Sequence, residues 1–408
     1  MTASTPDDPT AMAHQRDDAR VMGTYARRRP VFVRGQGTVL FDADGEARLD
    51  FLGGLAVNAL GHSHPEVAKA VCDQAATLQH TSNLFLTEPM LDLADRLAEV
   101  TGWDDAKVFF ANCGATANEA AIKLARRHGK SIAADKVRIV TLDRSFHGRT
   151  MATLEATGQT EKHAPFEPLM GYVDTVAHDD PDAVTAAVTD QHCAVLLEVV
   201  QGEGGVRPIE PGVLAAARAA CDARDALLIV DEVQTGMGRL GEWFGFQTTE
   251  VVPDVITLAK ALANGLPIGA VVAHGPAADV FGPGDHATTF GGNPVTAAAA
   301  VAVIDTIRSQ RLLDAAKVRS QRLTSAFDEL ARRHDLVGGW RGRGLLLGLE
   351  LTQPCAPQVE RAAEDNGLIV NAVGDDLVRF APPLTVSNAE IATAITALTT
   401  ALDEVAAA

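Results

Sequence analysis

Apolar segments without polar alternation run through the middle of the chain. Strands that are covered by helices on both faces bury every side chain, so such segments are typical of a mainly parallel sheet. Helical patterns lie between them, which predicts an α/β unit with a mainly parallel sheet flanked by helices. The segments predicted to be strands are Lys107–Ala111, Val137–Leu142, Ala194–Val200, Ala226–Val230, Val255–Leu258 and Ala270–Ala273.

The N-terminal part has a different pattern. The residues from Met1 to about Arg20 are polar and are expected to form a flexible arm. Residues 31–52 are predicted to form short strands, with turns at Gly35–Gly37 and at Asp44–Gly45.

Beyond Pro294 the pattern changes again. A long helical stretch precedes a strand predicted over Gly344–Leu351, and a last helix follows. The capping box Ser387–Glu390 marks the start of that helix, and apolar residues then recur along one face. These patterns predict a smaller α+β domain. The expected division is an N-terminal arm with strands packing on the small domain (1–60), a large domain (61–292) and a C-terminal small domain (293–408).

The charge balance excludes several classes of partner. The 408 residues include 53 acidic and 35 basic ones, which gives a formal net charge of −18. Nucleic acids and anionic membranes bind basic surfaces, so neither is an expected partner. No apolar run reaches the roughly 18 residues of a membrane span. The first twenty residues also lack the basic start and the apolar core of a signal peptide.

The cysteine and histidine patterns exclude two further classes of site. The five cysteines are scattered and form no Cys-x-x-Cys pair, which argues against a disulfide scaffold or a zinc ribbon and favours a cytoplasmic protein. His62 and His64 lie close together, but no third ligand is suitably spaced. No metal site is therefore expected.

The segment Asn112–Glu119 follows a predicted strand and opens a helical pattern. Gly114 allows a tight turn, so the amides of the first helical turn point outward. A helix start of this kind binds phosphate through its N–H groups and its dipole. An ordinary strand-to-helix turn explains the same residues, and the motif alone leaves both interpretations open.

Two ionisable residues end apolar runs farther along the chain. Asp231 follows Leu227–Val230, at the carboxyl end of a predicted strand, where ligands of parallel sheets lie. A helix N-cap is the alternative interpretation for Asp231. Lys260 ends another apolar run, and burial favours a neutral amine that can form a Schiff base with an aldehyde. A lysine that extends to the surface is the alternative.

A helix-start phosphate site, a strand-end acid and a strand-end lysine together match one cofactor, pyridoxal 5'-phosphate. Its aldehyde needs an amine, its pyridine nitrogen needs an anion, and its phosphate needs a helix start. Phe146 could stack on the pyridine ring, and Arg149 nearby could bind a carboxylate. An NAD-dependent dehydrogenase is disfavoured, because the glycine-rich segment Gly342–Gly348 leads into an apolar run instead of following one.

Several blocks, in one order along the chain, resemble the class III aminotransferases of the fold-type I pyridoxal phosphate enzymes. The similarity runs from about Tyr25 to Leu402, nearly the whole chain. The blocks are Gly53–Asn58, Leu60–Pro65, Thr81–Leu84, Gln201–Gly205, Asp231–Arg239 and Arg379–Pro383. The resemblance implies a fold-type I α/β architecture and a homodimer with shared active sites.

The chain departs from the family pattern at the predicted phosphate site. Cys113 replaces the usual serine and Thr116 the usual glutamate. A thiol is a weaker hydrogen-bond donor than a hydroxyl, and loss of a first-turn carboxylate changes the field at the helix start. Somewhat weaker cofactor binding is therefore expected. Ala263–Gly265 replaces a more glycine-rich run, which bears on the mobility of the loop after Lys260.

The resemblance also implies roles in cofactor binding. Lys260 and Asp231 would be the catalytic residues: Lys260 would attach the cofactor and move a proton, and Asp231 would pair with the pyridine nitrogen. Gln234 would hydrogen-bond the ring hydroxyl, and Thr289 would reach the phosphate in the partner subunit's site. The implied cofactor-binding set is Gly114, Ala115, Phe146, Asp231, Glu232, Val233, Gln234, Lys260 and Thr289.

For the substrates, Arg379 matches the arginine that holds the α-carboxylate of glutamate and of 2-oxoglutarate. Glu198 lies near the end of its predicted strand and could pair with Arg379 when no α-carboxylate is present. Arg149 and Thr288 match substrate-contacting positions, and Tyr25, one of only two tyrosines, is a further candidate.

The activity implied by the resemblance is that of the branch acting in arginine biosynthesis. It transfers the distal amino group of N2-acetyl-L-ornithine to 2-oxoglutarate and gives N-acetylglutamate 5-semialdehyde and glutamate. Related enzymes use ornithine, succinylornithine or 4-aminobutyrate, and these remain alternatives. An aminomutase of the same fold, which needs no 2-oxoglutarate, is a further one.

Overall fold

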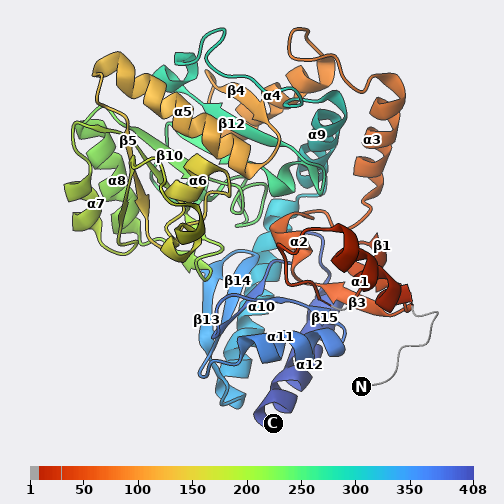
Figure 1. The fold of residues 1–408 in the computed structure, drawn as a ribbon. Helices are drawn as coiled ribbons and strands as arrows, with labels where there is room; N and C mark the ends of the chain where they lie inside the picture. Colours follow the sequence, from red (N-terminus) through yellow and green to blue (C-terminus); the bar gives the residue numbers. More distant parts are fainter. Residues whose placement is uncertain (1–8, 29) are drawn as a thin grey trace.

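A seven-stranded sheet forms the centre of the larger part of the molecule. The computed structural model describes residues 9–28 and 30–408 (Figure 1). In spatial order the strands are β4 (Lys107–Ala111), β12 (Gly269–Ala273), β11 (Val255–Leu258), β10 (Leu227–Asp231), β7 (His192–Leu197), β5 (Arg138–Leu142) and β6 (Val173–Val176). Only β12 runs antiparallel to its neighbours in this sheet. The predicted mainly parallel α/β fold is thereby confirmed.

Both faces of this sheet are covered by apolar side chains. In β10, Leu227 and Ile229 pack in the core that includes α5 (Gly114–Ile132). Leu228 and Val230 point the other way and share a core with residues of α8 (Pro211–Ala223). Figure 1 shows α5 lying across the sheet, and α8 packs over β10 and β7 and against α7 (Pro181–Ala187). Burial on both faces explains why the strands read as unbroken apolar runs.

The six predicted strands are all present, with small differences at their ends. The predicted run Ala194–Val200 is interrupted after Leu197, and Val200–Gln201 forms a separate short strand, β8, that pairs with β9 (Arg207–Pro208). β6 is an additional edge strand beside β5. These differences matter because the interruption of β7 sets the position of Glu198.

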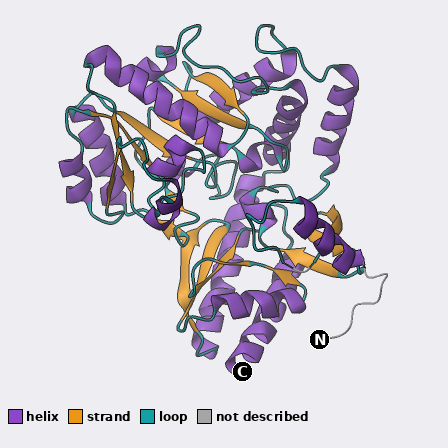
Figure 2. Ribbon diagram, in the orientation of Figure 1, coloured by secondary structure: helices purple, strands orange, loops and turns teal. Residues whose placement is uncertain are grey.

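The smaller part is built on an antiparallel sheet. Its spatial order is β13 (Val337–Arg343), β14 (Leu346–Leu351), β17 (Leu377–Phe380) and β16 (Asn371–Ala372). α10 (Leu312–Arg333), α11 (Ala356–Asp365) and α12 (Asn388–Ala406) accompany this sheet, as Figure 2 shows. The predicted capping box of α12 is confirmed, because Ser387 Oγ accepts the Glu390 N–H at 3.2 Å and the Glu390 carboxylate accepts the Ser387 N–H at 2.6 Å.

The N-terminal strands join the C-terminal part of the chain. β1 (Phe32–Gln36), β2 (Val39–Asp42) and β3 (Ala47–Asp50) form an antiparallel run, and β3 pairs in parallel with β15 (Leu368–Ile369). The predicted turn at Gly35–Gly37 is displaced, because β1 continues through Gln36 and the chain turns at Gly37–Thr38.

The expectation of a flexible arm over Met1–Arg20 is wrong for most of that segment. Pro9–Arg20 form helix α1, whereas residues 1–8 lie outside the described residues. Thr10 is buried and its hydroxyl donates to Asp44, and Arg27 pairs with Asp17 at 2.5 Å. A polar segment is therefore ordered by contacts with residues distant in sequence.

The helices near the end of the large sheet form a separate layer. α3 (Pro65–Thr77) and α4 (Glu88–Thr101) both pack against α9 (Pro294–Ser309).

Within residues 9–28 and 30–408 no helix is long and apolar enough to cross a membrane.

Candidate active site

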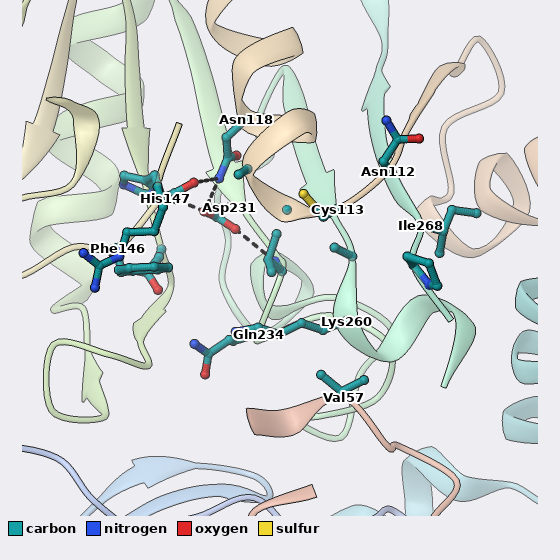
Figure 3. Close-up of a pocket in the computed structure, with 18 of the residues that line it drawn as sticks. Val57, Asn112, Cys113, Asn118, Phe146, His147, Asp231, Gln234, Lys260 and Ile268 are labelled. Atoms are coloured by element: carbon teal, nitrogen blue, oxygen red, sulfur yellow. Dashed lines mark hydrogen bonds and ion pairs between the residues drawn. The ribbon is translucent and has the colours of Figure 1, made fainter. Parts of the chain in front are cut away.

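Three neighbouring strands of the large sheet end at the same edge. β10 pairs in parallel register with β7 on one side and β11 on the other. Glu198, Asp231 and Lys260, which follow or end these strands, therefore lie close together. They line a cavity of about 410 Å³, together with the start of α5 and the loop after β5 (Figure 3). Of the residues predicted for the site, the cavity is lined by Gly114, Ala115, Phe146, Arg149, Glu198, Asp231, Val233, Gln234 and Lys260.

Lys260 presents an unpaired amine to this cavity. Within the described part of the chain its Nζ has no hydrogen bond or ion pair, although Glu203, Asp231 and Glu198 are near enough to act on its charge. The pKa of Lys260 is lowered to about 8, mainly by burial and also by the positive charge of Arg379. An amine with this pKa is a nucleophile near neutral pH.

The backbone at Lys260 is in a conformation that few non-glycine residues adopt. Its φ is 43°, in the left-handed region. Such a residue costs on the order of 1–3 kcal/mol and persists only where the surroundings impose it. The turn into the short helix η4 (Lys260–Ala263) therefore sets the direction in which the lysine side chain leaves the strand.

Asp231 is held by three donors at the end of β10. Its Oδ2 accepts hydrogen bonds from Asn118 Nδ2 and His147 Nδ1, both at 2.8 Å, and its Oδ1 accepts one from the Val233 N–H at 3.0 Å (Figure 3). Thr257 in turn donates to Asn118 Oδ1 at 2.7 Å, which orients the Asn118 amide. A carboxylate offers about four acceptor positions, so one remains on Oδ1.

Asn118 and His147 had no predicted role, although Asn118 lies within Asn112–Glu119 and His147 lies between Phe146 and Arg149. Asn118 stands among alanines on the buried face of α5, one turn after Gly114. His147 follows Phe146 and is buried, and its Nε2 has no partner in the described part of the chain. A buried polar residue needs a hydrogen-bonding partner, and this requirement is the sequence signal that could have identified Asn118.

The start of α5 is capped in an unusual way. The Thr116 hydroxyl oxygen accepts the N–H groups of Asn112 and Cys113, each at 3.0 Å, and so replaces the usual glutamate of a capping box. The amides of Gly114 and Ala115 have no partner among residues 9–28 and 30–408. These free amides at a helix start form an anion site.

Close packing explains the glycine at the helix start. A Cβ on Gly114 would lie 3.0 Å from a methyl group of Val233. Gly148 is also required, since a Cβ there would lie 2.5 Å from Thr153 Oγ1 and 2.8 Å from the Ala115 Cβ. These two contacts bring the loop carrying Phe146 and the loop after β10 against the first turn of α5.

A left-handed turn brings Val57 to the opposite wall of the cavity. The φ angles of Gly53–Ala56, the segment labelled α2, run from 59° to 68°. Left-handed backbone costs about 1–2 kcal/mol for each non-glycine residue, so tertiary contacts must impose it. A Cβ on Gly53 would lie 2.8 Å from the Ala381 carbonyl oxygen, which only glycine avoids.

Arg379 pairs with Glu203 and not with Glu198. Arg379 is buried on β17, and its Nη1 donates to Glu203 Oε1 at 2.6 Å and to the Gly202 carbonyl at 3.0 Å. Its Nη2 donates to Asn371 Oδ1 at 2.7 Å. The predicted Glu198–Arg379 pair is therefore wrong in this structure. The turn after β8 places Glu203 near β17, whereas Glu198 lies directly after the carboxyl end of β7.

The two glutamates differ in charge as well as position. Glu198 accepts the N–H groups of Phe146 at 3.0 Å and Gly202 at 3.4 Å, and burial together with the charge of Asp231 raises its pKa. Burial alone would raise the Glu203 pKa too, but Arg379 and Lys260 outweigh this and lower it. Glu203 is therefore the ionised partner of Arg379.

Gln234 lies between the cavity and this pair. Its Nε2 donates to Glu203 Oε1 at 3.2 Å, and its Oε1 is buried without a partner in the described chain. Arg149 lies near Phe146, with its guanidinium carbon 5.6 Å from the centre of the ring. These two positions leave a polar amide on one side of the cavity and a cation on another.

Glu232 does not line the cavity. Its carboxylate accepts the N–H groups of Gly245 at 2.8 Å and Phe246 at 2.7 Å, as well as the Thr235 hydroxyl. Burial raises its pKa to about 7. The side chain points away from the cavity because successive residues at the strand end face opposite sides. Glu232 thus holds the following loop, and its predicted role in cofactor binding stays a prediction.

Three other predicted residues also lie outside the cavity lining. Thr288 Oγ1 accepts a hydrogen bond from Asn112 Nδ2 at 2.9 Å, so it reaches the cavity through Asn112. Thr289 lines a small separate pocket near Ser82 and Asn83. Tyr25 is 75% exposed beside Arg27. In a single chain none of the three contributes directly to the cavity.

The site combines a free buried amine, a carboxylate at a strand end and free amides at a helix start. This combination is typical of α/β enzymes that use a cofactor with an aldehyde and a phosphate. Comparison with known proteins gives the family. Residues 24–402 match the family model described as "Aminotransferase class-III". The chain belongs to the class III aminotransferases, which are pyridoxal phosphate-dependent transaminases.

Curated relatives and solved structures agree with this assignment. The chain is 49% identical to the acetylornithine aminotransferase of Streptomyces coelicolor over 96% of each chain, and 48% identical to that of Mycobacterium tuberculosis over 97% of each. It matches the structure of ornithine aminotransferase from Toxoplasma gondii with a TM-score of 0.93 and 30% identity, covering 100% of this chain and 97% of that one. The structure of N-acetylornithine aminotransferase from Stenotrophomonas maltophilia matches with a TM-score of 0.82 and 35% identity, covering 94% and 98%.

Proposed function

We propose that this chain transfers the distal amino group of N2-acetyl-L-ornithine to 2-oxoglutarate, in arginine biosynthesis. The products are N-acetylglutamate 5-semialdehyde and glutamate. Curated relatives at 46–49% identity carry the name of that activity. The observation that carries the proposal is the Arg379–Glu203 pair beside Lys260.

The residues around the cavity fit pyridoxal 5'-phosphate. The free amides of Gly114 and Ala115 suit its phosphate, and Lys260 suits its aldehyde. Asp231 keeps one acceptor position for the pyridine nitrogen, and the orphaned Gln234 Oε1 needs a polar partner of the kind that a ring hydroxyl supplies. When bound, the cofactor supplies an aldehyde that accepts an amino group and a ring that withdraws electrons.

Lys260 is the group positioned to move a proton. With a pKa near 8 its amine can accept a proton from carbon and return it at neutral pH. Asp231 supplies a fixed negative charge to the ring, because three donors hold its carboxylate in place. Val57 and the Phe146 ring line the remaining walls and limit access of water.

The Arg379–Glu203 pair allows one site to accept two unlike substrates. 2-Oxoglutarate has two carboxylates. Arg379 can bind one of them and Arg149 the other. N-Acetylornithine presents a distal amine with no carboxylate beside it, so Arg379 would be a buried cation without a partner. Glu203 neutralises Arg379 in that case and must release it when 2-oxoglutarate binds. Arg149 then holds the α-carboxylate of N-acetylornithine at the far end of the pocket.

A donor panel tests this function. The purified holoenzyme is assayed with 2-oxoglutarate and N-acetylornithine, ornithine, succinylornithine or 4-aminobutyrate. The proposal requires N-acetylornithine to have the highest kcat/KM. Higher values with ornithine or 4-aminobutyrate would assign the chain to another branch of the family. Turnover of a donor without 2-oxoglutarate would indicate an aminomutase.

We propose that the enzyme works as a homodimer with shared sites. Leu84, Phe85 and Leu86 are 86%, 67% and 77% exposed in one chain, and Phe290 is 62% exposed next to Thr289. Exposed apolar residues gathered around the Thr289 pocket are typical of a protein interface. Thr289 then reaches the phosphate in the partner subunit's site. Sedimentation of a fully active monomer would contradict this proposal.

A cytoplasmic location is part of the same proposal. All five cysteines are free thiols in the structure. Free thiols persist in a reducing compartment.

A further inference from the structure

A second, polar cavity of about 760 Å³ adjoins the candidate active site. Its lining residues come from the loop after β5 and from β9 on one side, and from β13, β16 and β17 of the smaller part on the other. Glu203 and Arg379 line it from one end. Neither residue lines the first cavity, but Gln234 does, and its Nε2 donates to Glu203 Oε1 at 3.2 Å, so Gln234 and Glu203 connect the two cavities.

Three arginines besides Arg379 line this second cavity. They come from distant parts of the chain, and we call them the arginine cluster: Arg144, Arg207 and Arg341. Arg144 follows β5, Arg207 lies in β9, and Arg341 lies in β13. The turn Gly204–Gly205 packs among them. Gly205 has a φ of 100°, which favours glycine, and a Cβ there would lie 2.9 Å from Arg341 Nη2 and 3.5 Å from Arg207 Nε.

The charges of the cluster are only partly neutralised. Arg341 pairs with Glu350 and donates to the Gly205 carbonyl at 2.6 Å, and Arg144 lies 3.7 Å from Asp143. Arg207 has one hydrogen bond, from its Nε to the Gly204 carbonyl at 3.2 Å, and no acidic partner within the described residues. Its two terminal nitrogens are free to bind a ligand.

The other charged residues around Arg207 also make the second cavity positive. Burial lowers the Arg207 pKa, and the positive charges of Arg341 and Arg144 lower it further, whereas Glu350 and Asp376 act in the opposite direction. Five basic and three acidic side chains line the cavity in a chain with a net charge of −18. A positive cavity on an acidic protein attracts small anions selectively.

We propose that the arginine cluster is a docking site for small dicarboxylates, at which Arg207 captures 2-oxoglutarate before it reaches Arg379. This inference rests on the proposed function for the identity of the substrate. A guanidinium binds a carboxylate bidentately, and a dicarboxylate can contact Arg207 with one end while the other approaches Arg379. Binding at the cluster then raises the local concentration of the acceptor next to the Arg379–Glu203 pair.

The two substrates should respond differently to this site. 2-Oxoglutarate carries two negative charges at neutral pH, whereas N-acetylornithine carries one charge of each sign and has no net charge. The cluster therefore accelerates capture of the acceptor and has little effect on the amino donor. The charge of the arginine cluster acts mainly on the rate at which 2-oxoglutarate binds. This effect weakens at high salt, because ions screen the charge.

A kinetic comparison tests the docking site. Arg207→Gln should lower kcat/KM for 2-oxoglutarate roughly tenfold at low salt, with kcat and the donor kcat/KM unchanged, and the difference should shrink at high salt. Arg207→Lys should restore part of the loss. Arg322→Gln, on the exposed side of α10, is the matched control because Arg322 has no ion pair in the described chain. Equal acceptor kcat/KM and equal salt dependence in Arg207→Gln and wild type would overturn the proposal.

An equilibrium measurement separates this inference from the proposed function. Glutarate, a dicarboxylate that cannot react, is titrated into the holoenzyme by calorimetry, with acetate and inorganic phosphate as comparison anions. Glutarate should bind more tightly than either, and Arg207→Gln should weaken it roughly tenfold while Arg322→Gln leaves it unchanged. Binding of phosphate as tight as that of glutarate would overturn the assignment to dicarboxylates. This result does not depend on which amino donor the enzyme uses.

Discussion

Glu203 accepts a hydrogen bond of 2.6 Å from the buried Arg379, and this pair links the turn after β8 to β17. The same carboxylate also accepts from Gln234, which lies on the loop that follows Asp231. One acid therefore connects the arginine of the smaller part with the cofactor side of the cavity. Loss of this acid would leave Arg379 free for a carboxylate.

Glu203→Gln should change donor preference. Without the negative charge, Arg379 remains available to the α-carboxylate of glutamate, and N-acetylornithine no longer finds it neutralised. The ratio of kcat/KM for glutamate to that for N-acetylornithine should rise roughly tenfold or more, since one charge-assisted pair is worth about 1.5–3 kcal/mol. Glu242→Gln, which removes a surface partner of Lys317, serves as the control. An unchanged ratio would show that Glu203 does not switch the site.

Lys260→Ala should abolish turnover and covalent retention of the cofactor. Within the described chain no other lysine lines the active-site cavity. The measurement is cofactor that stays with the protein after borohydride reduction and dialysis, with Lys317→Ala as control. Retention by Lys260→Ala equal to that of the control would assign attachment to a different residue.

The pKa of Lys260 also predicts a pH dependence. Below pH 8 its amine is mostly protonated and cannot attack an aldehyde, and above pH 8 it is mostly neutral. The rate of cofactor uptake by the apoenzyme should rise as the pH approaches 8 and then become level. A lysine at the ordinary value of 10.5 would still show a rising rate at pH 9. Stopped-flow absorbance between pH 6 and 10 distinguishes the two curves.

His147→Phe should weaken cofactor binding through Asp231. The change removes one of the three donors to the carboxylate, while Asn118 and Val233 remain. Because a buried hydrogen bond to a charged group contributes about 1.5–3 kcal/mol, the cofactor dissociation constant should rise roughly tenfold or more, and kcat should fall with it. His147→Gln, which keeps a donor, should recover part of both. His334→Gln, near the C-terminal helix, controls for general loss of stability.

Thr116→Ala should destabilise the start of α5. Thr116 Oγ1 accepts two N–H groups that would otherwise be without a partner. The free energy of unfolding should fall by about 1 kcal/mol, measured by urea denaturation of the apoprotein. Thr400→Ala, in an exposed position on α12, is the control. A loss no larger than that of the control would show that Thr116 does not cap the helix.

The sequence by itself determined six of the seven strands of the large sheet and the order in which the candidate site residues follow them. Unbroken apolar runs such as Leu227–Val230 specify strands covered on both faces, and this needs no knowledge of partners. Parallel strands then bring their carboxyl ends to one edge. For that reason Gly114, Asp231 and Lys260 could be expected around one cavity from their positions at strand ends alone.

Only the tertiary structure decided which side chains pair. Glu198 and Glu203 are five residues apart, and their separate roles follow from where β7 stops and which loop faces β17. Likewise, Glu232 turns toward Gly245 and away from the cavity that its neighbour Asp231 lines. A local sequence pattern indicates whether a segment is buried and at what spacing its apolar residues recur. The partner of a buried charge depends on residues brought together from far along the chain, and no local pattern contains that information.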